Sequence, residues 1–324
     1  MRNGIWLGLC ALALGLLTAQ GAAAGQCELK LIASYSMMGN PKYEVVVPIV
    51  MAGKPVATGI QTGAVVGFIS PEVSTALGLL KRRINPNTLV YGADGARYDQ
   101  YVTMPTIDIG AIEARNTKLV LVDDTLLPHR EPWATLGANI LQIFDLEFDF
   151  AEKKLRFFSQ DHCDGQVVYW SAAYTSVPFH LLENGQIALE MTLDGRPIDA
   201  ILNSGSSYTY INARIAADVY GIDENSSRVT TVKSTYPGAP PIRAAVFDSL
   251  SIGGISMPRP TLCLQEDTLR SRAIQDIPIK TEKKSGMDIP HYPNLELGLD
   301  VLHHLRVYIA YREHKIYATA ADAQ

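Results

Sequence analysis

The sequence has little charge, little cysteine and no excess of basic residues. Only 19% of its 324 residues are charged, and 28 Lys and Arg stand against 33 Asp and Glu. Proteins that bind nucleic acid usually carry a basic patch on their surface. Because this sequence has no excess of basic residues, we expect no nucleic-acid partner. Four cysteines in a chain of this length do not make a disulfide-rich scaffold. The 47% share of hydrophobic residues excludes a disordered chain.

Several common catalytic and metal-binding motifs are also missing. The sequence contains no HExxH or CxxC motif, no GxSxG motif and no glycine-rich phosphate loop. His303 and His304 are adjacent, so we expect them to point in different directions at the surface rather than to share a metal ion. We therefore expect no metal and no cofactor.

The longest apolar run lies at the N-terminus. Residues 5–17 read IWLGLCALALGLL, which is too short to span a bilayer, and small residues at 22–24 suit a signal peptidase. We expect residues 1–24 to be a cleaved secretory signal, which makes the protein exported, either periplasmic or secreted. The alternative is an uncleaved anchor. No later segment is long and apolar enough to span a membrane.

Signal cleavage would remove Cys10 and leave Cys27, Cys163 and Cys263. An exported compartment permits disulfides, and an odd number of cysteines leaves room for at most one intramolecular pair among these. We expect Cys27 to pair with Cys163, because they flank the first half of the mature chain. The alternative is that all of these thiols are free and buried.

The sequence contains an internal repeat. Residues 53–64, GKPVATGIQTGA, align without a gap with residues 195–206, GRPIDAILNSGS. A second block, residues 136–157, aligns with residues 297–318. The second copy is longer between its two blocks, and we expect the additional residues in 267–293, a polar and charged surface loop.

Each copy has the same predicted order of elements. A β-rich run, over residues 43–51 or 187–193, ends in a glycine turn, and an apolar run then enters a loop of small residues. A short helix comes next, and alternating strands follow it over residues 98–109 or 243–252. This order predicts an all-β fold of two similar lobes with short helices. We expect the lobes at residues 27–164 and 165–324.

The short helices carry capping signals. Ser70 is the predicted N-cap of the first helix, with Pro71 at its first position, and Gly78 ends it. In the second copy Asn212 is the predicted N-cap and Gly221 ends the helix.

The closing run of the first copy alternates with a period of two, as a strand does. Phenylalanine and leucine fall on one face and acids on the other: Phe144, Leu146, Phe148 and Phe150 against Asp145, Glu147 and Asp149.

This arrangement resembles the retroviral-type (retropepsin-like) aspartic proteases. In that family a hydrophobic run enters an xTGA or xSGS loop, and a hydrophobic-Leu-Gly-x-Asn/Asp block follows later in the chain. Residues 61–64 and 203–206 match the loop, and residues 136–141 and 297–302 match the block. The resemblance covers nearly all of the mature chain, twice. It implies two β-barrel-like lobes in a bilobal, pepsin-like arrangement, with a peptide groove between them.

The resemblance places the family's two catalytic aspartates where this chain has amides, at Gln61 and Asn203. Two aspartates in close approach share one proton, so that one is a base and the other an acid. An amide donates and accepts hydrogen bonds but is no base near neutral pH. Of the nearby acids, Asp194 and Asp199 are not expected to reach the loop. Gln61 and Asn203 are therefore expected to act as hydrogen-bonding residues of the lobe interface; chemistry by an unfamiliar route is the alternative.

The scaffold around these positions is retained. The resemblance implies that the hydroxyls of Thr62 and Ser204 hold the two loops together across the lobe junction. It also implies that Gly63 and Gly205 supply an unusual backbone geometry.

A hairpin tip follows in the first copy, with Asp-Gly as its turn signal. Tyr91, Gly92 and Gly95 fall where the family places its flap, which would cover a bound peptide. A plain surface hairpin is the alternative.

Three functions follow from these observations. The first is an exported, monomeric pseudoprotease that binds an extended peptide or a partner protein in the groove without cutting it. The second is an active aspartic endopeptidase, native or deliberately inactivated at Gln61 and Asn203. The third is a structural envelope protein whose groove is closed.

Overall fold

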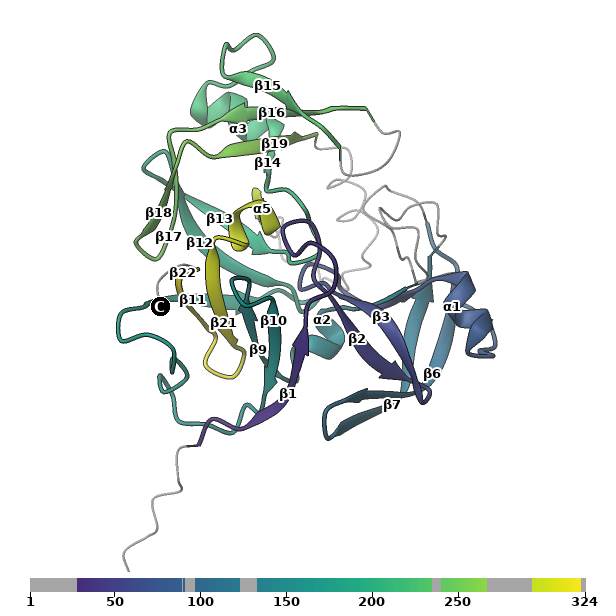
Figure 1. Ribbon diagram of the computed structural model, residues 1–324. Helices are drawn as coiled ribbons and strands as arrows, with labels where there is room; N and C mark the ends of the chain where they lie inside the picture. The colour runs from purple at the N-terminus through teal and green to yellow at the C-terminus, as the bar shows by residue number, and fades with distance from the viewer. Residues whose placement is uncertain are drawn as a thin grey trace, which may run out of the picture.

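The computed structural model describes residues 28–88, 90, 97–122, 133–234, 240–266 and 293–321. Figure 1 shows lobe one at the right and lobe two at the upper left, joined by strands between them. The predicted signal at residues 1–24, Cys27, the predicted flap residues Tyr91, Gly92 and Gly95, and most of the predicted loop at 267–293 lie outside the described residues.

Lobe one is built around a closed ring of strands. The ring runs β2-β3-β8-β4-β7-β6, and β6 pairs back to β2. Inward-facing residues such as Val47, Ile49 and Met51 are fully buried inside it. Closure of a sheet on itself leaves no unpaired edge within the ring. The strands are β2 (Val46–Met51), β3 (Lys54–Ile60), β4 (Phe68–Ile69), β6 (Gln100–Ile109), β7 (Ile112–Leu121) and β8 (Ala134–Leu136), with β5 (Arg82–Arg83) paired to β6 outside the ring.

Lobe two repeats this plan with one interruption. The strand predicted over residues 243–252 is two strands, because the chain bends between them. At this bend Asp248 O accepts from Arg259 N at 2.9 Å. Arg259 lies between β18 and β19 and has a positive φ of 50°, so the opposite strand is interrupted at the same level. As a result β16 pairs with β19, whereas β17 pairs with β18 on one side and with β12 on the other.

The strands of lobe two are β12 (Ile187–Leu193), β13 (Arg196–Leu202), β14 (Tyr210–Asn212), β15 (Val229–Val232), β16 (Ile242–Val246), β17 (Ser249–Ile252), β18 (Ile255–Pro258), β19 (Thr261–Gln265) and β20 (Leu295–Leu297).

The predicted helices and their caps are confirmed. Helix α1 spans Pro71–Ala76, and the Ser70 hydroxyl accepts a hydrogen bond from Val73 N. Helix α3 spans Ala213–Tyr220, where the Asn212 side chain accepts from two backbone N–H groups and Gly221 closes the helix with a φ of 66°. The single-turn helices α2 (Ala138–Leu141) and α5 (Leu299–Leu302) directly follow the two Leu-Gly pairs.

An antiparallel sheet with strands from both repeats joins the lobes. Its order is β1-β10-β9-β21-β22-β11, so the equivalent strands β9 and β21 pair at the centre. Glu147 lies opposite Tyr308, and these two residues are also equivalent in the repeat. The pseudo-two-fold axis therefore passes between them. The strands are β1 (Leu31–Ser36), β9 (Asp145–Asp149), β10 (Lys154–Phe158), β11 (Thr175–Leu181), β21 (Leu305–Ala310) and β22 (Lys315–Ala320).

The acidic face of β9 is buried as deeply as its apolar face. Asp145, Glu147 and Asp149 are all buried. Residues 159–174, which link β10 to β11, supply partners to this face: His162 Nε2 lies 2.6 Å from Asp145 Oδ2, and Tyr169 donates to Glu147 at 2.6 Å. The expected boundary between the lobes, at 164–165, falls within this linking segment.

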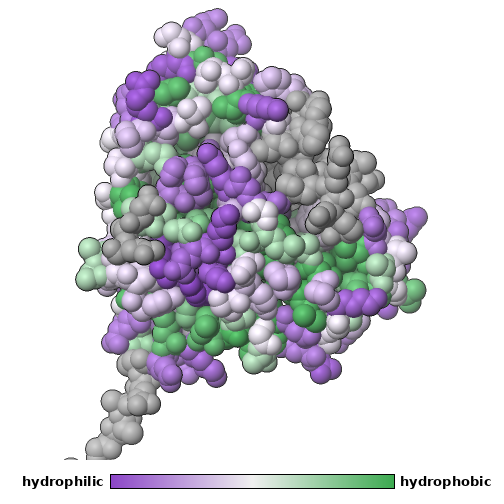
Figure 2. Space-filling model, in the orientation of Figure 1, coloured by the Kyte–Doolittle hydropathy of each residue, from purple (hydrophilic) through white to green (hydrophobic). Residues whose placement is uncertain are grey.

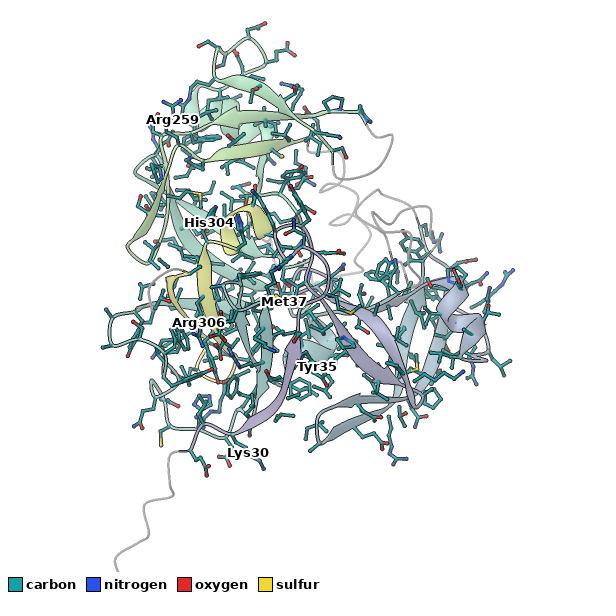
Figure 3. All side chains as sticks on the ribbon, in the orientation of Figure 1. Lys30, Tyr35, Met37, Arg259, His304 and Arg306 are labelled. Carbon is teal, nitrogen blue, oxygen red and sulfur yellow. The ribbon has the colours of Figure 1, made fainter. Side chains whose placement is uncertain are left out.

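Glu147 is the centre of a charged cluster on that face. Arg306 of the second repeat donates to Glu147 Oε1 at 2.6 and 2.9 Å, and Arg156 of the first repeat donates to the same oxygen at 2.9 Å. Burial and the Glu147 carboxylate raise the pKa of Tyr169 to about 12, so its hydroxyl remains a donor. Arg306, labelled in Figure 3, also lies 4.6 Å from the ring centroid of Trp170. Asp149 contacts the same two arginines at 3.1 and 3.3 Å, so two acids of β9 hold both repeats, and Glu147 also holds their linking segment.

The cysteines differ in state. Cys163 is disulfide-bonded, which rules out the alternative that it is a free thiol. Because Cys27 lies outside the described residues, the pair Cys27–Cys163 stays a prediction. Cys263 is free and buried, and burial, with the nearby Asp300 adding to it, raises the pKa of its thiol to about 12. Among the described helices, none has the length and apolarity needed to cross a membrane.

Replacing Glu147 by Gln should destabilise the protein strongly. Arg156 and Arg306 lose their shorter carboxylate contact and keep Asp149, at 3.1 and 3.3 Å, as the shared counter-charge. Breaking a buried ionic contact typically lowers the free energy of unfolding by about 3 kcal/mol or more. The matched control is Asp218→Asn, which removes the counter-charge of Arg214 on the exposed face of α3 and should cost less than about 1 kcal/mol. Equal shifts of the two urea midpoints would contradict the central role of Glu147.

The raised pKa of Cys263 predicts slow alkylation, because the thiolate is the reactive form. Iodoacetamide at pH 8 should leave the folded mature protein unmodified. In denaturant without reductant it should modify Cys263 alone, and reduction should expose the remaining thiols. Mass spectrometry of the intact protein reads the number of adducts. Modification of every cysteine without reductant would rule out the disulfide.

Candidate functional site

The two small-residue loops of the repeat meet at the lobe junction, at the ends of β3 and β13. Thr62 and Ser204 are almost fully buried there and exchange hydrogen bonds across the junction. Thr62 Oγ1 donates to Leu202 O at 2.8 Å and accepts from Ser204 N at 3.0 Å. Ser204 Oγ donates to Ile60 O at 2.6 Å and accepts from Thr62 N at 3.1 Å. Each hydroxyl therefore serves the backbone of the opposite lobe.

The Leu-Gly blocks brace these loops from behind in the same way in both lobes. Gln61 N donates to Leu136 O at 3.0 Å, and Asn203 N donates to Leu297 O at 2.9 Å. These bonds continue the parallel pairing of β3 with β8 and of β13 with β20. The two motifs, far apart in the sequence, are therefore parts of one structural unit.

Gln61 and Asn203 each lie against the glycine of the opposite loop. A Cβ at Gly63 would lie 2.2 Å from Asn203 Cγ, and a Cβ at Gly205 would lie 2.7 Å from Gln61 Cγ. Neither glycine has a left-handed backbone, so the expectation of an unusual backbone geometry is wrong. The reason for glycine here is space, because a methyl group would collide with the amide that crosses the junction.

The amide of Asn203 is held at both ends. Its Oδ1 accepts from Gly205 N at 2.8 Å, and its Nδ2 donates to Glu296 Oε1 at 2.8 Å. The backbone N–H requires an oxygen and the carboxylate requires a donor, so the two contacts together set the orientation of the amide.

Glu296 is a site residue that the motifs do not indicate. It lies on β20 beside Ile201, immediately before Leu297. Leu295 and Leu297 are buried in the core, and Glu296 faces the other side of the strand, toward Asn203. The sequence could have indicated Glu296 only through the parallel pairing of the Leu-Gly block with the strand before the loop, which places Glu296 next to Asn203. The equivalent residue in lobe one is Thr135, beside Gly59.

The acids near the loop in sequence do not reach it. Asp194 binds Arg228 at 3.0 Å and accepts from the backbone N of Asp248 at 2.6 Å, at the far end of the β12–β13 hairpin. Asp199 is exposed on β13. Neither is in position to replace an acid at Asn203, as the strand geometry predicts.

A hollow flanks the loop of lobe one. It has a volume of about 340 Å³ and is lined by Val65, Val66, Asn139, Gln142 and residues 181–185. Gln186, which directly follows residues 181–185 of lobe two, donates a side-chain hydrogen bond to Gly63 O. The hollow is therefore formed by both lobes next to the small-residue loop.

The adjacent histidines lie together rather than apart. The ring centroids of His303 and His304 are 3.8 Å apart, so the expectation that they diverge is wrong. His303 Nδ1 is bonded to Leu299 O at 2.7 Å, at the end of α5. His304, labelled in Figure 3, is exposed, and Figure 2 shows hydrophilic residues gathered over this part of the surface. Within the described ranges no group of three or more His, Cys, Asp or Glu residues could hold a metal ion.

Replacing Thr62 by Val should loosen the lobe junction. The change keeps the shape but leaves Leu202 O and Ser204 N without their partner, and each buried unpaired group costs about 1–3 kcal/mol. The control is Thr75→Val, whose exposed hydroxyl bonds only within helix α1. Urea denaturation should show a lower free energy of unfolding for the Thr62 variant by about 3 kcal/mol and little change for the control. A Thr62 variant as stable as the unmodified protein would show that the crossed bonds do not hold the lobes together.

A comparison with protein families identifies this scaffold. The family model described as aspartyl protease matches residues 47–140 and 189–277, one region in each repeat and together more than half of the chain. A comparison with curated proteins found no match. The two matched regions hold the loops of Gln61 and Asn203, and the bilobal β fold agrees with the family. The resemblance is thus confirmed, and the chain belongs to the aspartyl protease family, with two copies of the family's domain.

Proposed function

We propose that this protein is an exported, non-catalytic member of the family that binds an extended polypeptide between its lobes. The observation that carries the proposal is the pair Gln61 and Asn203, two amides at the catalytic positions of a loop scaffold that is otherwise complete. The predicted secretory signal supports the exported location.

The loss of both acids argues against hydrolysis by the family's route. That route needs one ionised carboxylate to take a proton from water and one protonated carboxylate to polarise the peptide carbonyl. Gln61 and Asn203 do neither. Glu296 adds a single carboxylate beside Asn203, and a single carboxylate is not ionised and protonated at once.

The retained scaffold argues for binding. Replacing two neighbouring carboxylates by amides removes a like-charge repulsion and leaves the crossed hydrogen bonds in place. The hollow beside Val65 and Val66 offers apolar side chains together with the polar Asn139 and Gln142. An extended peptide suits such a groove, since its main chain supplies hydrogen bonds and its alternate side chains fill pockets.

One chain supplies both lobes, which supports a monomer. The shared sheet pairs β9 with β21, and Glu147 binds arginines from both repeats. The axis that a homodimer would place between two chains therefore lies inside this one.

The test restores Asp at both positions. The variant Gln61→Asp with Asn203→Asp should cleave an unstructured protein such as casein at acid pH, and pepstatin should stop it. The single variants Gln61→Asp and Asn203→Asp are the matched controls. They should stay inactive, because each lacks half of the pair. The unmodified protein should leave casein intact while it binds peptides from a random octapeptide mixture, detected by mass spectrometry after capture.

Two outcomes would overturn the proposal. Pepstatin-sensitive cleavage by the unmodified protein would make it an active endopeptidase. An unmodified protein that binds no peptide, with a doubly restored variant that does not cut, would favour the structural protein with a closed groove.

A further inference from the structure

The repeat extends beyond the small-residue loops into a turn that precedes them. The alignment of residues 53–64 with residues 195–206 continues without a gap toward the N-terminus, where it pairs the turn at 39–43 with the turn at 181–185. The same backbone hydrogen bond closes both turns, because the last residue donates to the second residue, at 2.9 Å in one turn and at 2.8 Å in the other. The two turns are therefore equivalent parts of the two repeats.

Each turn lies beside the small-residue loop of the opposite repeat, at one end of the lobe junction. At the lobe-two end, Ser207 Oγ donates to Tyr43 O at 2.8 Å, so the turn and the loop are in direct contact. At the lobe-one end, the equivalents of these two residues are Val65 and Gly185, and both line the hollow of about 340 Å³. A contact at one end thus corresponds to a hollow at the other.

Two tyrosines at the lobe-two end have no aromatic counterpart at the lobe-one end. Burial, Cys263 and Tyr43 raise the pKa of Tyr208, so Tyr43 and Tyr208 lie within electrostatic reach of each other. Their equivalents are Gly185 and Val66, which both line the hollow. The hollow therefore lies where the lobe-two end carries two phenol rings.

The lining of the hollow combines apolar side chains with amides. Two valines and two leucines supply the apolar part, and Asn139 and Gln142 supply side-chain amides that make no hydrogen bond with any residue of the described ranges. A Cβ at Gly185 would lie 3.5 Å from Gln142 Oε1, so a group placed above that glycine meets an amide. The one charged residue of this lining, Glu183, is exposed and disfavours an acidic ligand.

We propose that the hollow is a pocket for a tyrosine side chain of the bound polypeptide, in the place that corresponds to Tyr43 and Tyr208 at the lobe-two end. The ring packs against Val65 and Val66, and the hydroxyl bonds to a side-chain amide of the lining. This inference rests on the proposed function, since it names a side chain by which the groove would recognise a polypeptide.

The size and the chemistry of the hollow both favour a phenol. Its volume falls within the range of about 300–1,000 Å³ that is usual for ligand sites. An aromatic side chain buries more apolar area than leucine or alanine, and the gain in affinity grows with that area. A phenol hydroxyl also donates and accepts hydrogen bonds as an amide does, whereas leucine leaves the amides of the lining without a partner.

The test uses octapeptide mixtures whose central residue is fixed as Tyr, Leu or Ala. The other positions are randomised without aromatic residues, and every peptide carries the same N-terminal fluorophore. Fluorescence polarisation measures the binding of each mixture to the unmodified protein and to variants whose hollow is filled.

The filling variant is Val65→Tyr, which places a ring in the hollow from its own lining. The matched control is Val219→Tyr, the same change on helix α3 and outside the hollow, at a valine that is 37% exposed against 39% for Val65. Val66→Tyr, which copies Tyr208, is a second variant should Val65→Tyr not fold. Gly185 is left unchanged, because its φ of 84° would strain any side chain there.

The unmodified protein and the Val219 control should bind the Tyr mixture about tenfold more tightly than the Ala mixture, with the Leu mixture between them. In the filled variants the three mixtures should bind alike, with the affinity for the Ala mixture retained. A Tyr preference that survives filling, or equal binding of the Tyr and Leu mixtures to the unmodified protein, would overturn this inference and leave the proposed function standing. Binding of no mixture by the unmodified protein would overturn both.

Discussion

The crossed hydrogen bonds between Thr62 and Ser204 are the constraint on which the rest of the molecule depends. Each hydroxyl both donates to and accepts from the backbone of the other lobe, so the four bonds form only if the two loops approach along a two-fold axis. The same axis passes between Glu147 and Tyr308 in the shared sheet. The crossed hydrogen bonds of the loops and the pairing of β9 with β21 thus share one pseudo-two-fold axis, and the two lobes are arranged around it.

A residue near such an axis lies opposite its own equivalent. In an assembly of two identical chains an acid there would face an acid, with the repulsion that follows. A fused chain escapes this, because the two repeats differ in sequence. Glu147 corresponds to Tyr308, and Glu296 corresponds to Thr135. Asp145 corresponds to Arg306, and Arg306 binds Glu147. Each of these acids therefore stands in one repeat only, and the equivalent position in the other repeat carries a donor or a neutral side chain.

The sequence predicts what local pattern determines and misses what distant pairing determines. The repeat, the loops and the caps at Ser70 and Asn212 are correct because a few adjacent residues specify each of them. The bend that separates β16 from β17 is missed, because it depends on pairing with β12 and β19. A period of two separates the faces of β9 correctly, but it does not reveal that residues 159–174 supply the partners that bury its acids.

Glu296 illustrates the same limit within the site. It is separated from Asn203 by most of lobe two and becomes its neighbour only through the parallel pairing of β13 with β20. Recognition of a motif assigns the positions inside the motif, whereas the side chains that surround them come from strands elsewhere in the chain. The reason for Gly63 and Gly205 has the same origin, because what requires the glycine is an amide from the opposite lobe.

Under the proposed function, the exchange of acids for amides separates two properties that the family's site combines. An aspartate pair that shares a proton holds one net negative charge at the axis and uses it both to attract and to react. Here the matching positions are the amides Gln61 and Asn203, and Asn203 donates to the carboxylate of Glu296 in lobe two. A single carboxylate has no second acid with which to share a proton, so it cannot supply an acid and a base at once. The two halves of the site therefore no longer present the same surface, because the residue equivalent to Glu296 in lobe one is the neutral Thr135.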